Sequence, residues 1–267
     1  MRQSSLLLTE NLYLRKRTKK EAVTNSVILR AVRITLDEVM RQVREVYRPA
    51  ITLSYAQSLD GCISAGKGIP TAISGDQSLV MTHKLRAMHD AILVGINTVL
   101  IDNPSLTVRH VEGDSPIPII LDSHLRIPTE AKLLHQNGKQ VIIAALPSAS
   151  KEREKKLVEA GARVVRISAA SGGGIKLSEL FRWLREHDVK SLMIEGGAKV
   201  ISSVLAERLG DQLVLTIAPK FFGRNGVNAV EDLNCIRPTS IPCLAHVEYE
   251  RLGDDMLVWG RPVAMTK

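Results

Sequence analysis

Aromatic residues are scarce in this chain, at 3% of its 267 residues. Proteins that bind single-stranded nucleic acid stack the bases on aromatic side chains, so this scarcity argues against such a binder. Cysteine is scarce too: Cys62, Cys235 and Cys243 are odd in number and lack C-x-x-C spacing. That pattern indicates neither a disulfide framework nor a structural zinc site, and it favours a reducing compartment.

Long apolar runs are also missing, and none approaches the ~18 to 20 residues that a membrane-spanning helix needs. The start of the chain has only Leu6 to Leu8 as an apolar core. This is too short for a secretory signal. We therefore expect a cytoplasmic protein without a membrane partner, and leave open an organelle transit peptide in the Arg-rich leader.

The signatures of several enzyme classes are absent: G-x-S-x-G, H-E-x-x-H, G-x-x-x-x-G-K-[ST] and G-x-G-x-x-G. Hydrolase triads, zinc proteases, P-loop NTPases and the dinucleotide fingerprint therefore lack their usual support. His83, His89 and His110 show no metal-ligand spacing, so we expect core or surface roles for them and no metal.

The charge is unevenly distributed along the chain. The whole chain carries +8, but residues 1–48 hold 11 Lys/Arg against 5 Asp/Glu, a net of +6, which leaves +2 for the other 219 residues. Most of the basicity thus belongs to the N-terminal extension. The mildly positive main body is compatible with a phosphorylated substrate and cofactor.

The chain is predicted to have two parts, a basic helical extension over residues 1–48 and one α/β domain over residues 49–267. Residues 1–34 are basic and poor in turn signals, so we expect them to be partly disordered. A capping box that begins at Thr35 predicts a helix over Thr35 to Tyr47, with one apolar face to bury.

From residue 51 onward, apolar runs of strand length alternate with helical patterns. Predicted strands cover 51–55, 91–95, 117–122, 141–146, 163–167, 191–194 and 211–218; predicted helices open at Ser74 and cover 151–159, 177–187 and 198–209; a hairpin joins 245–252 to 256–260. This order predicts a mostly parallel sheet with helices on it and an antiparallel edge at the C-terminus.

The stretch after the strand at 191–194 is the strongest candidate for a binding site. Gly196 and Gly197 separate this strand from a helix that starts at Ala198. Two glycines let the backbone approach a ligand closely, and the free N–H groups of the helix start attract an anion such as phosphate. Glu195 would repel a phosphate, so we expect it to face a neutral polar ligand. An ordinary turn that uses glycine for packing is the alternative.

Polar residues follow other strands as well, at the edge where ligands of open α/β sheets collect. They are Asp60 in the turn 57–61, Asn97 and Thr98, the segment 102–109, and Asp122 and Ser123. One continuous pocket would bring them together, although Asp60 and Asp102 are also ordinary turn residues. Arg86 and Arg109 are the candidate cations for an anionic substrate, because a guanidinium can hold phosphate bidentately.

Several separate strings resemble the reductase family of riboflavin biosynthesis, in order and at matching spacing across residues 50–260. They are SYAQSLDGCIS (54–64), PTAISGD (70–76), THKLRAMHDAILVGINTVLIDNPSLTVR (82–109), LDS (121–123), SLMIEGGAKV (191–200) and APKFFG (218–223). The resemblance implies a dihydrofolate-reductase-like fold, NADPH as cofactor and a homodimer. It also implies reduction of a ribosylamino-pyrimidine 5′-phosphate to its ribitylamino form.

The same resemblance implies roles for individual residues. Ala56, Thr98, Asp102 and Ser123 would line the NADPH site, and Gly196, Gly197, Ala198, Lys199, Val200, Ile201, Ser202 and Ser203 would cradle its phosphates; Thr71, Arg86, Leu106, Arg109 and Glu195 would contact the substrate. Asp60 or Glu195 would handle the proton that the ring oxygen takes as the sugar opens, unless water does so.

The motifs Y-A-Q-S-L-D and T-H-x-L-R resemble more closely those of the fungal and archaeal type of this family. That resemblance implies the 2,5-diamino-pyrimidinone as substrate. The bacterial type fuses the domain to a zinc deaminase and takes the deaminated uracil; residues 1–48 are too few for a deaminase, and H-x-E with P-C-x-x-C is absent.

A pterin reductase is one alternative function. A nucleic-acid- or partner-binding role of the extension is another, although no nucleic acid is expected.

Overall fold

The computed structural model describes residues 26–42, 47–136, 138–231, 233 and 241–264. The strands are β1 (Ala50–Ser58), β2 (Cys62–Ser64), β3 (Ala91–Gly95), β4 (Ile117–Leu121), β5 (Ile142–Ala145), β6 (Arg163–Arg166), β7 (Ser191–Gly196), β8 (Gln212–Ala218), β9 (Val227–Asn228), β10 (Pro242–Leu252) and β11 (Asp255–Ala264). The helices are α2 (Val27–Gln42), α3 (Asp76–Ala87), α4 (Ile96–Asp102), α5 (Lys151–Glu159), α6 (Leu177–Glu186) and α7 (Ala198–Ala206). Short 3₁₀ turns cover Lys132–Leu134 and Gly223–Asn225.

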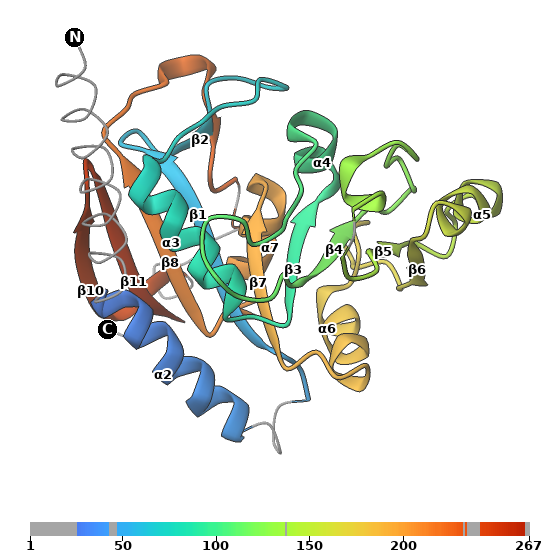
Figure 1. The fold of residues 1–267 in the computed structure, drawn as a ribbon, viewed down its shortest axis with the longest axis horizontal. Coiled ribbons are helices and arrows are strands. Elements are labelled where there is room, and N and C mark those ends of the chain that lie inside the picture. Colours follow the sequence, from blue (N-terminus) through green and yellow to red (C-terminus); the bar gives the residue numbers. More distant parts are fainter. Residues whose placement is uncertain (1–25, 43–46, 137, 232, 234–240, 265–267) are drawn as a thin grey trace, which may run out of the picture.

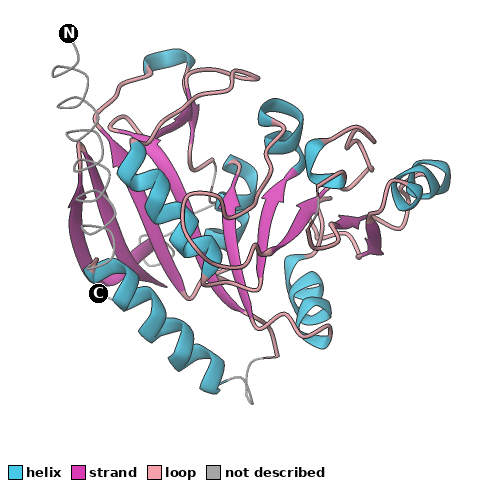
Figure 2. Cartoon of the chain, viewed as in Figure 1, coloured by secondary structure: helices cyan, strands magenta, loops and turns pink. Residues whose placement is uncertain are grey.

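One nine-stranded sheet runs through the molecule in the order β10-β11-β8-β1-β7-β3-β4-β5-β6 (Figures 1 and 2). The neighbours from β8 to β6 pair in parallel, while β11 pairs antiparallel with both β8 and β10. The predicted α/β architecture, a mostly parallel sheet with a C-terminal antiparallel hairpin, is confirmed. β2 and β9 form a separate small sheet.

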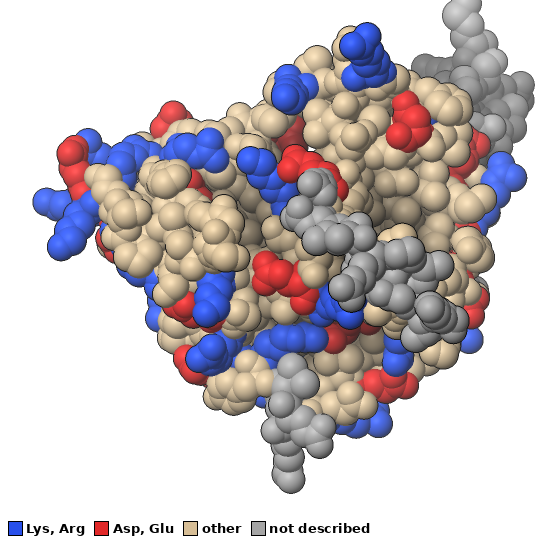
Figure 3. Space-filling view, turned by 180° about the vertical axis from the view of Figure 1, so that it is seen from behind, with Lys and Arg blue, Asp and Glu red and all other residues tan. Residues whose placement is uncertain are grey.

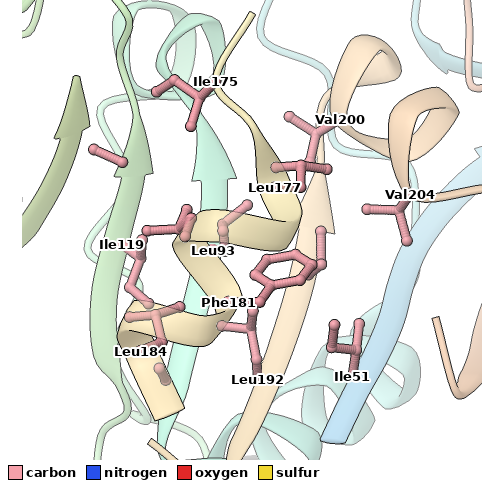
Figure 4. Packing of buried hydrophobic residues seen from close by; sticks show 14 of the residues in the cluster. Ile51, Leu93, Ile119, Ile175, Leu177, Phe181, Leu184, Leu192, Val200 and Val204 are labelled. Atoms are coloured by element: carbon pink, nitrogen blue, oxygen red, sulfur yellow. The ribbon is translucent and has the colours of Figure 1, made fainter. Parts of the chain in front are cut away.

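Helices cover both faces of the sheet because successive strand residues point to opposite sides. On one face, α6 presents Leu177, Leu180, Phe181 and Leu184, spaced at helical intervals, and α7 adds Val200 and Val204. In Figure 4 these side chains meet strand residues that include Leu93, Ile119 and Leu192. The central strands are therefore buried on both faces, as parallel strands are.

The opposite face is covered by α2 and α3 near the antiparallel edge. Ile28, Val32 and Leu36 of α2 share one buried cluster with Met81 of α3 and Trp259 of β11. Neighbouring strand residues such as Ile92 and Val94 face this side, together with α4 and α5. No helix in the described ranges is long and apolar enough to cross a membrane.

The helix of the N-terminal extension begins earlier than its capping box predicts. It starts at Val27, and the side chain of Ser26 accepts the N–H of Leu29 at 3.1 Å. Thr35 lies in mid-helix, 2% exposed, so the prediction that it starts the helix is wrong. Residues 27–34 are helical, and the expectation of partial disorder in residues 1–34 stays a prediction. Residues 1–25 and 43–46 lie outside the described part, and a division at residue 48 stays a prediction.

One other local prediction needs correction. The helix predicted to open at Ser74 begins at Asp76, and Gly75 before it donates its N–H to Asp255 at 2.7 Å. The residues after β3, for which the sequence predicted no helix, form the short helix α4 (Ile96–Asp102).

Candidate functional site

A cleft of about 1070 Å³ opens at the carboxyl ends of β3, β4 and β7. Its walls are the first residues of α4 and α7, the segment after β4, the end of β2 with the loop that follows it (63–71) and the glycine-rich loop 170–174. This is the edge of an open α/β sheet where ligands bind. The structure thus brings together most of the strand-end segments that the sequence singled out.

The two glycines before α7 serve different purposes. Gly196 has φ +95, and a Cβ there would lie 2.9 Å from Ile201 Cδ1, so packing requires glycine. Gly197 has φ +82 and ψ 146 as the N-cap of α7, which an L-residue rarely adopts; its Cβ would meet only Thr98 Oγ1, at 3.6 Å. The packing alternative therefore holds for Gly196, and Gly197 is the glycine that faces the cleft.

The start of α7 has the features of an anion site. Val200 and Ile201 donate their N–H groups to the carbonyl of Gly197 at 2.9 and 3.0 Å. The N–H groups of Ala198 and Lys199 have no carbonyl to reach within the helix, because each would need one that precedes its first turn. Both residues line the cleft, so the positive end of the helix lies at its wall, where it suits an anion.

Of the predicted cofactor residues, most line the cleft. These are Thr98, Asp102, Ser123, Gly197, Ala198, Lys199, Val200, Ser202 and Ser203; those outside its lining are Ala56, Gly196 and Ile201. Ile201 is fully buried in the core. The Ser202 hydroxyl donates to the Ala198 carbonyl and accepts the Glu231 N–H, both at 2.8 Å. Burial raises the pKa of Asp102.

Of the predicted substrate residues, Thr71 lines the cleft, whereas Arg86, Leu106, Arg109 and Glu195 are absent from its lining. Arg86 and Glu195 instead form a bidentate ion pair, with Nε–Oε1 at 2.6 Å and Nη2–Oε2 at 2.7 Å. Their side chains are only 11% and 16% exposed. Arg86 Nη1 also donates to the carbonyl of Thr107 at 3.1 Å, so each of the three guanidinium nitrogens donates one hydrogen bond to a protein group.

The segment around Leu106 and Arg109 lies beside this ion pair. Leu106 has φ +55 and a side chain buried in the core, so only its backbone is available to a ligand. Arg109 is exposed, and its Nη1 donates to Thr107 Oγ1 at 3.0 Å. Arg86 and Arg109 thus both contact Thr107, although they lie 23 positions apart in the chain (109 − 86).

Asp60 holds the turn after β1 against the loop after β8. Its carboxylate accepts the Ser58 hydroxyl and the N–H groups of Phe222 and Gly223, the last at 2.7 Å. These hydrogen bonds, that of Ser58 first, lower the pKa of Asp60. Asp60 is therefore ionised at neutral pH, and its contacts are those of a loop anchor.

Other cleft residues were missed in the sequence. They include Lys67, His124, Arg126, Glu207 and the glycines of the loop 172–174. His124 and Arg126 directly follow Ser123, so the rule of strand ends could have found them, whereas nothing in the pattern marks Glu207 at the end of α7. Within the described ranges, no group of three or more His, Cys, Asp or Glu side chains is placed to hold a metal ion.

Charges of both signs alternate over the face seen from behind (Figure 3). On this face basic side chains gather along the upper left, and acidic side chains lie among and below them. The cleft likewise carries both signs, with Lys199 and Arg126 on one hand and Asp102 and Glu207 on the other.

Comparison with known proteins identifies the family. Residues 49–258 match the model of the RibD C-terminal domain. The chain belongs to this family. It is 35% identical over 227 residues to the 2,5-diamino-6-ribosylamino-4(3H)-pyrimidinone 5′-phosphate reductase of Eremothecium gossypii, covering 80% of this chain and 88% of that protein. The predicted resemblance to the riboflavin-biosynthesis reductase family is therefore confirmed.

Two further relatives extend the comparison. The riboflavin biosynthesis protein RibD of Aquifex aeolicus is 33% identical over 219 residues, which are 79% of this chain but only 57% of that protein. The solved structure of the riboflavin biosynthesis reductase Rib7 of Saccharomyces cerevisiae superposes with a TM-score of 0.66 at 28% identity, covering 81% of this chain and 91% of that one. The fold and the sequence thus point to the same family.

Proposed function

We propose that this protein is an NADPH-dependent reductase that converts the ribosyl group of 2,5-diamino-6-ribosylamino-4(3H)-pyrimidinone 5′-phosphate to ribityl. The observation that carries the proposal is the start of α7, where Gly197 and two free N–H groups face a cleft of about 1070 Å³. Membership of the RibD C-terminal domain family over residues 49–258 supports it.

The residues of the cleft fit a dinucleotide. Gly197 lets the backbone come close to a ligand, and the positive end of α7 suits a pyrophosphate. Thr98 and Ser123 add hydroxyl groups on the other two walls, and Lys199 adds a cation. The volume, about 1070 Å³, lies just above the roughly 300 to 1,000 Å³ usual for small-molecule sites. When bound, NADPH supplies the hydride.

The choice of substrate rests on relatives and motifs. The Eremothecium protein carries the diamino-pyrimidinone name, and the Y-A-Q-S-L-D wording is closer to that type. The Aquifex relative, named RibD, is nearly as similar at 33% identity, so the deaminated uracil is the second candidate. A pterin would give Arg109 no phosphate to bind, and it is the least supported of the three.

In the proposed reaction a hydride adds to C1′ of the sugar, the bond from C1′ to the ring oxygen breaks, and that oxygen takes a proton. Thr71 and Arg109 would bind the substrate, with Arg109 at its phosphate. Arg86 and Glu195 hold each other at 2.6 Å, so they would present the Leu106–Arg109 segment and a rigid wall to the substrate. This positioning is the main contribution that the chain makes to the rate.

Two carboxylates are the candidates for handling the proton. Asp60 is held as an acceptor by three hydrogen bonds, and its lowered pKa makes it a poor proton donor. Glu195 is held as an acceptor by Arg86. Both are therefore arranged as anions, which favours water as the proton donor. Asp60→Asn and Glu195→Gln test this: each should leave the pH profile of kcat unchanged, and a profile that loses one limb would identify the proton donor.

NADPH oxidation with three substrates tests the proposal as a whole. The diamino compound, its deaminated analogue and dihydrofolate would be compared at equal concentrations. Turnover should be fastest with the diamino compound and absent with dihydrofolate. Faster turnover of the deaminated compound would overturn the substrate choice. If NADPH binds but none of the three is reduced, the reductase proposal itself fails.

The same resemblance supports a cytoplasmic homodimer as the working form. Light scattering on the full chain measures the oligomeric state directly, and a monomer at working concentration would contradict this part of the proposal. Removal of residues 1–48 tests whether the basic extension adds a binding role. Lost binding of a nucleic acid or protein with unchanged turnover would assign it one.

A further inference from the structure

His83 is a buried histidine with one polar contact that the proposed mechanism does not use. It lies in α3 with a fully buried side chain, one turn before Arg86. Its Nδ1 is 3.0 Å from the backbone nitrogen of Arg109. Because a backbone N–H can only donate, Nδ1 is the acceptor and the neutral ring carries its proton on Nε2.

The environment keeps this ring neutral. Burial, together with the charges of Arg86, His110 and Arg109, lowers the pKa of His83 to about 3. The ring of His110 packs edge-on against it, with ring centroids 4.5 Å apart. His83 is therefore available as an acceptor throughout the physiological pH range.

The other ring nitrogen argues against a purely structural role. His83 Nε2 is buried, and no residue in the described ranges accepts a hydrogen bond from it. A buried donor without a partner is unfavourable, so packing alone would favour an apolar ring at this position. What histidine adds, and phenylalanine would not, is the acceptor for the Arg109 N–H.

The segment from Thr107 to Arg109 depends on such side-chain contacts. It lies outside the helices and strands, and three different side chains hold its backbone. Arg86 holds the Thr107 carbonyl at 3.1 Å, Ser115 Oγ accepts the Val108 N–H at 3.0 Å, and His83 accepts the Arg109 N–H. The direction in which Arg109 leaves the backbone is thus set by side chains of α3 and of the following loop.

We propose that His83 is a positioning residue for substrate binding: by accepting the Arg109 N–H, it fixes the backbone from which Arg109 reaches the substrate phosphate. This inference rests on the proposed function, in which Arg109 binds that phosphate. The two residues of α3 then have different roles. Arg86 binds Glu195 and holds the Thr107 carbonyl, whereas His83 holds the backbone of Arg109 itself.

The test compares Michaelis constants for the diamino-pyrimidinone phosphate and for NADPH in four variants. His83→Phe removes the acceptor and keeps a ring, and His83→Asn retains an acceptor close to the position of Nδ1. Arg109→Gln reports the phosphate contact directly. His89→Phe is the control, a buried histidine of the same region that contacts Thr52 and Leu85 but not this segment.

His83→Phe should raise KM for the pyrimidine phosphate about ten-fold, because a small displacement of a binding group is costly, and leave KM for NADPH unchanged. His83→Asn should restore most of the loss. Hydrogen exchange of the Arg109 amide should accelerate in the phenylalanine variant alone. His89→Phe should lower Tm but should not raise KM for the pyrimidine phosphate relative to KM for NADPH. His83→Met replaces the phenylalanine variant if that protein does not fold.

Each other result counts against a specific part. If Arg109→Gln raises KM but His83→Phe does not, the inference is wrong and the proposed function stands. If both Michaelis constants rise together, or if His83→Asn behaves like His83→Phe, His83 has only a structural role. If Arg109→Gln leaves KM unchanged, or the wild-type enzyme reduces no pyrimidine phosphate, the proposed substrate contact fails and the inference fails with it.

Discussion

The two halves of the proposed site are held in different ways. The cofactor half, formed by Thr98, Ser123, Gly197 and Lys199, lines an open cleft and relies on backbone shape and a helix end. The arginine half, formed by His83, Arg86, Thr107, Arg109 and Glu195, is tied together by side-chain hydrogen bonds and an ion pair. The cofactor half lies open to ligands in the cleft. The arginine half joins residues that are distant in sequence, and their side chains already bind one another. We therefore expect substitutions in the arginine half to cost stability, and those in the cofactor half to cost ligand affinity first.

The largest effect is expected from breaking the ion pair. Arg86→Met should lower the free energy of unfolding by about 3 to 5 kcal/mol, because it leaves Glu195 as an unpaired, mostly buried charge. Urea denaturation measures this loss. The double variant Arg86→Met with Glu195→Leu should recover much of it, since no charge is then stranded. A loss below about 1 kcal/mol in the single variant would mean that solvent screens the pair as it does at surfaces.

Acid should also weaken the region around α3. Burial lowers the pKa of His89 to about 4, below its unfolded value of roughly 6.5. The unfolded state then binds more protons between these values, so stability is complete above about pH 6.5 and falls as the pH drops toward 4. The loss for His89 is about 3 kcal/mol. Urea midpoints across this range measure it, and His89→Gln should reduce the slope without abolishing it, because buried His83, whose pKa is lowered to about 3, contributes over the same range. An unchanged slope in that variant would assign the effect to other groups.

The cofactor half should respond less in stability and more in binding. Gly197→Ala forces a side chain onto φ +82 and should cost about 1 to 3 kcal/mol. It should also raise KM for NADPH by about ten-fold, because relaxation of the turn moves the N–H groups of α7. Gly172→Ala is the matched control, since it lies in the same cleft with open space around it and no positive φ. Equal effects of both variants would contradict a special role for Gly197.

The difference between the halves also explains what the sequence could predict. The strand at 191–194, the two glycines and the helix from Ala198 are adjacent in the chain, so periodicity and turn chemistry suffice to find them. The mostly parallel sheet and its antiparallel hairpin follow in the same way from alternation of elements, whereas the order of the strands was not predicted. The polar residues that follow these strands, among them Thr98, Ser123 and Gly197, line the observed cleft.

For the arginine half, the sequence identified candidate residues but not the contacts between them. Arg86 and Glu195 lie 109 residues apart, and no local pattern says that they pair with each other. The start of α2 was misplaced because the capping box at Thr35 competes with a real cap at Ser26, which also donates to the distant Glu250 at 2.6 Å. Tertiary contacts decided these cases, and a single sequence carries no signal for them.

The two-part site is the central claim, and one steady-state experiment tests it most directly. Michaelis constants for NADPH and for the diamino-pyrimidinone phosphate would be measured in wild type, Gly197→Ala and Arg109→Gln. The account predicts a crossed pattern: Gly197→Ala raises only the constant for NADPH, and Arg109→Gln raises only the constant for the pyrimidine phosphate. A rise in the same constant for both variants, or in neither, would contradict the division of the site into these two halves.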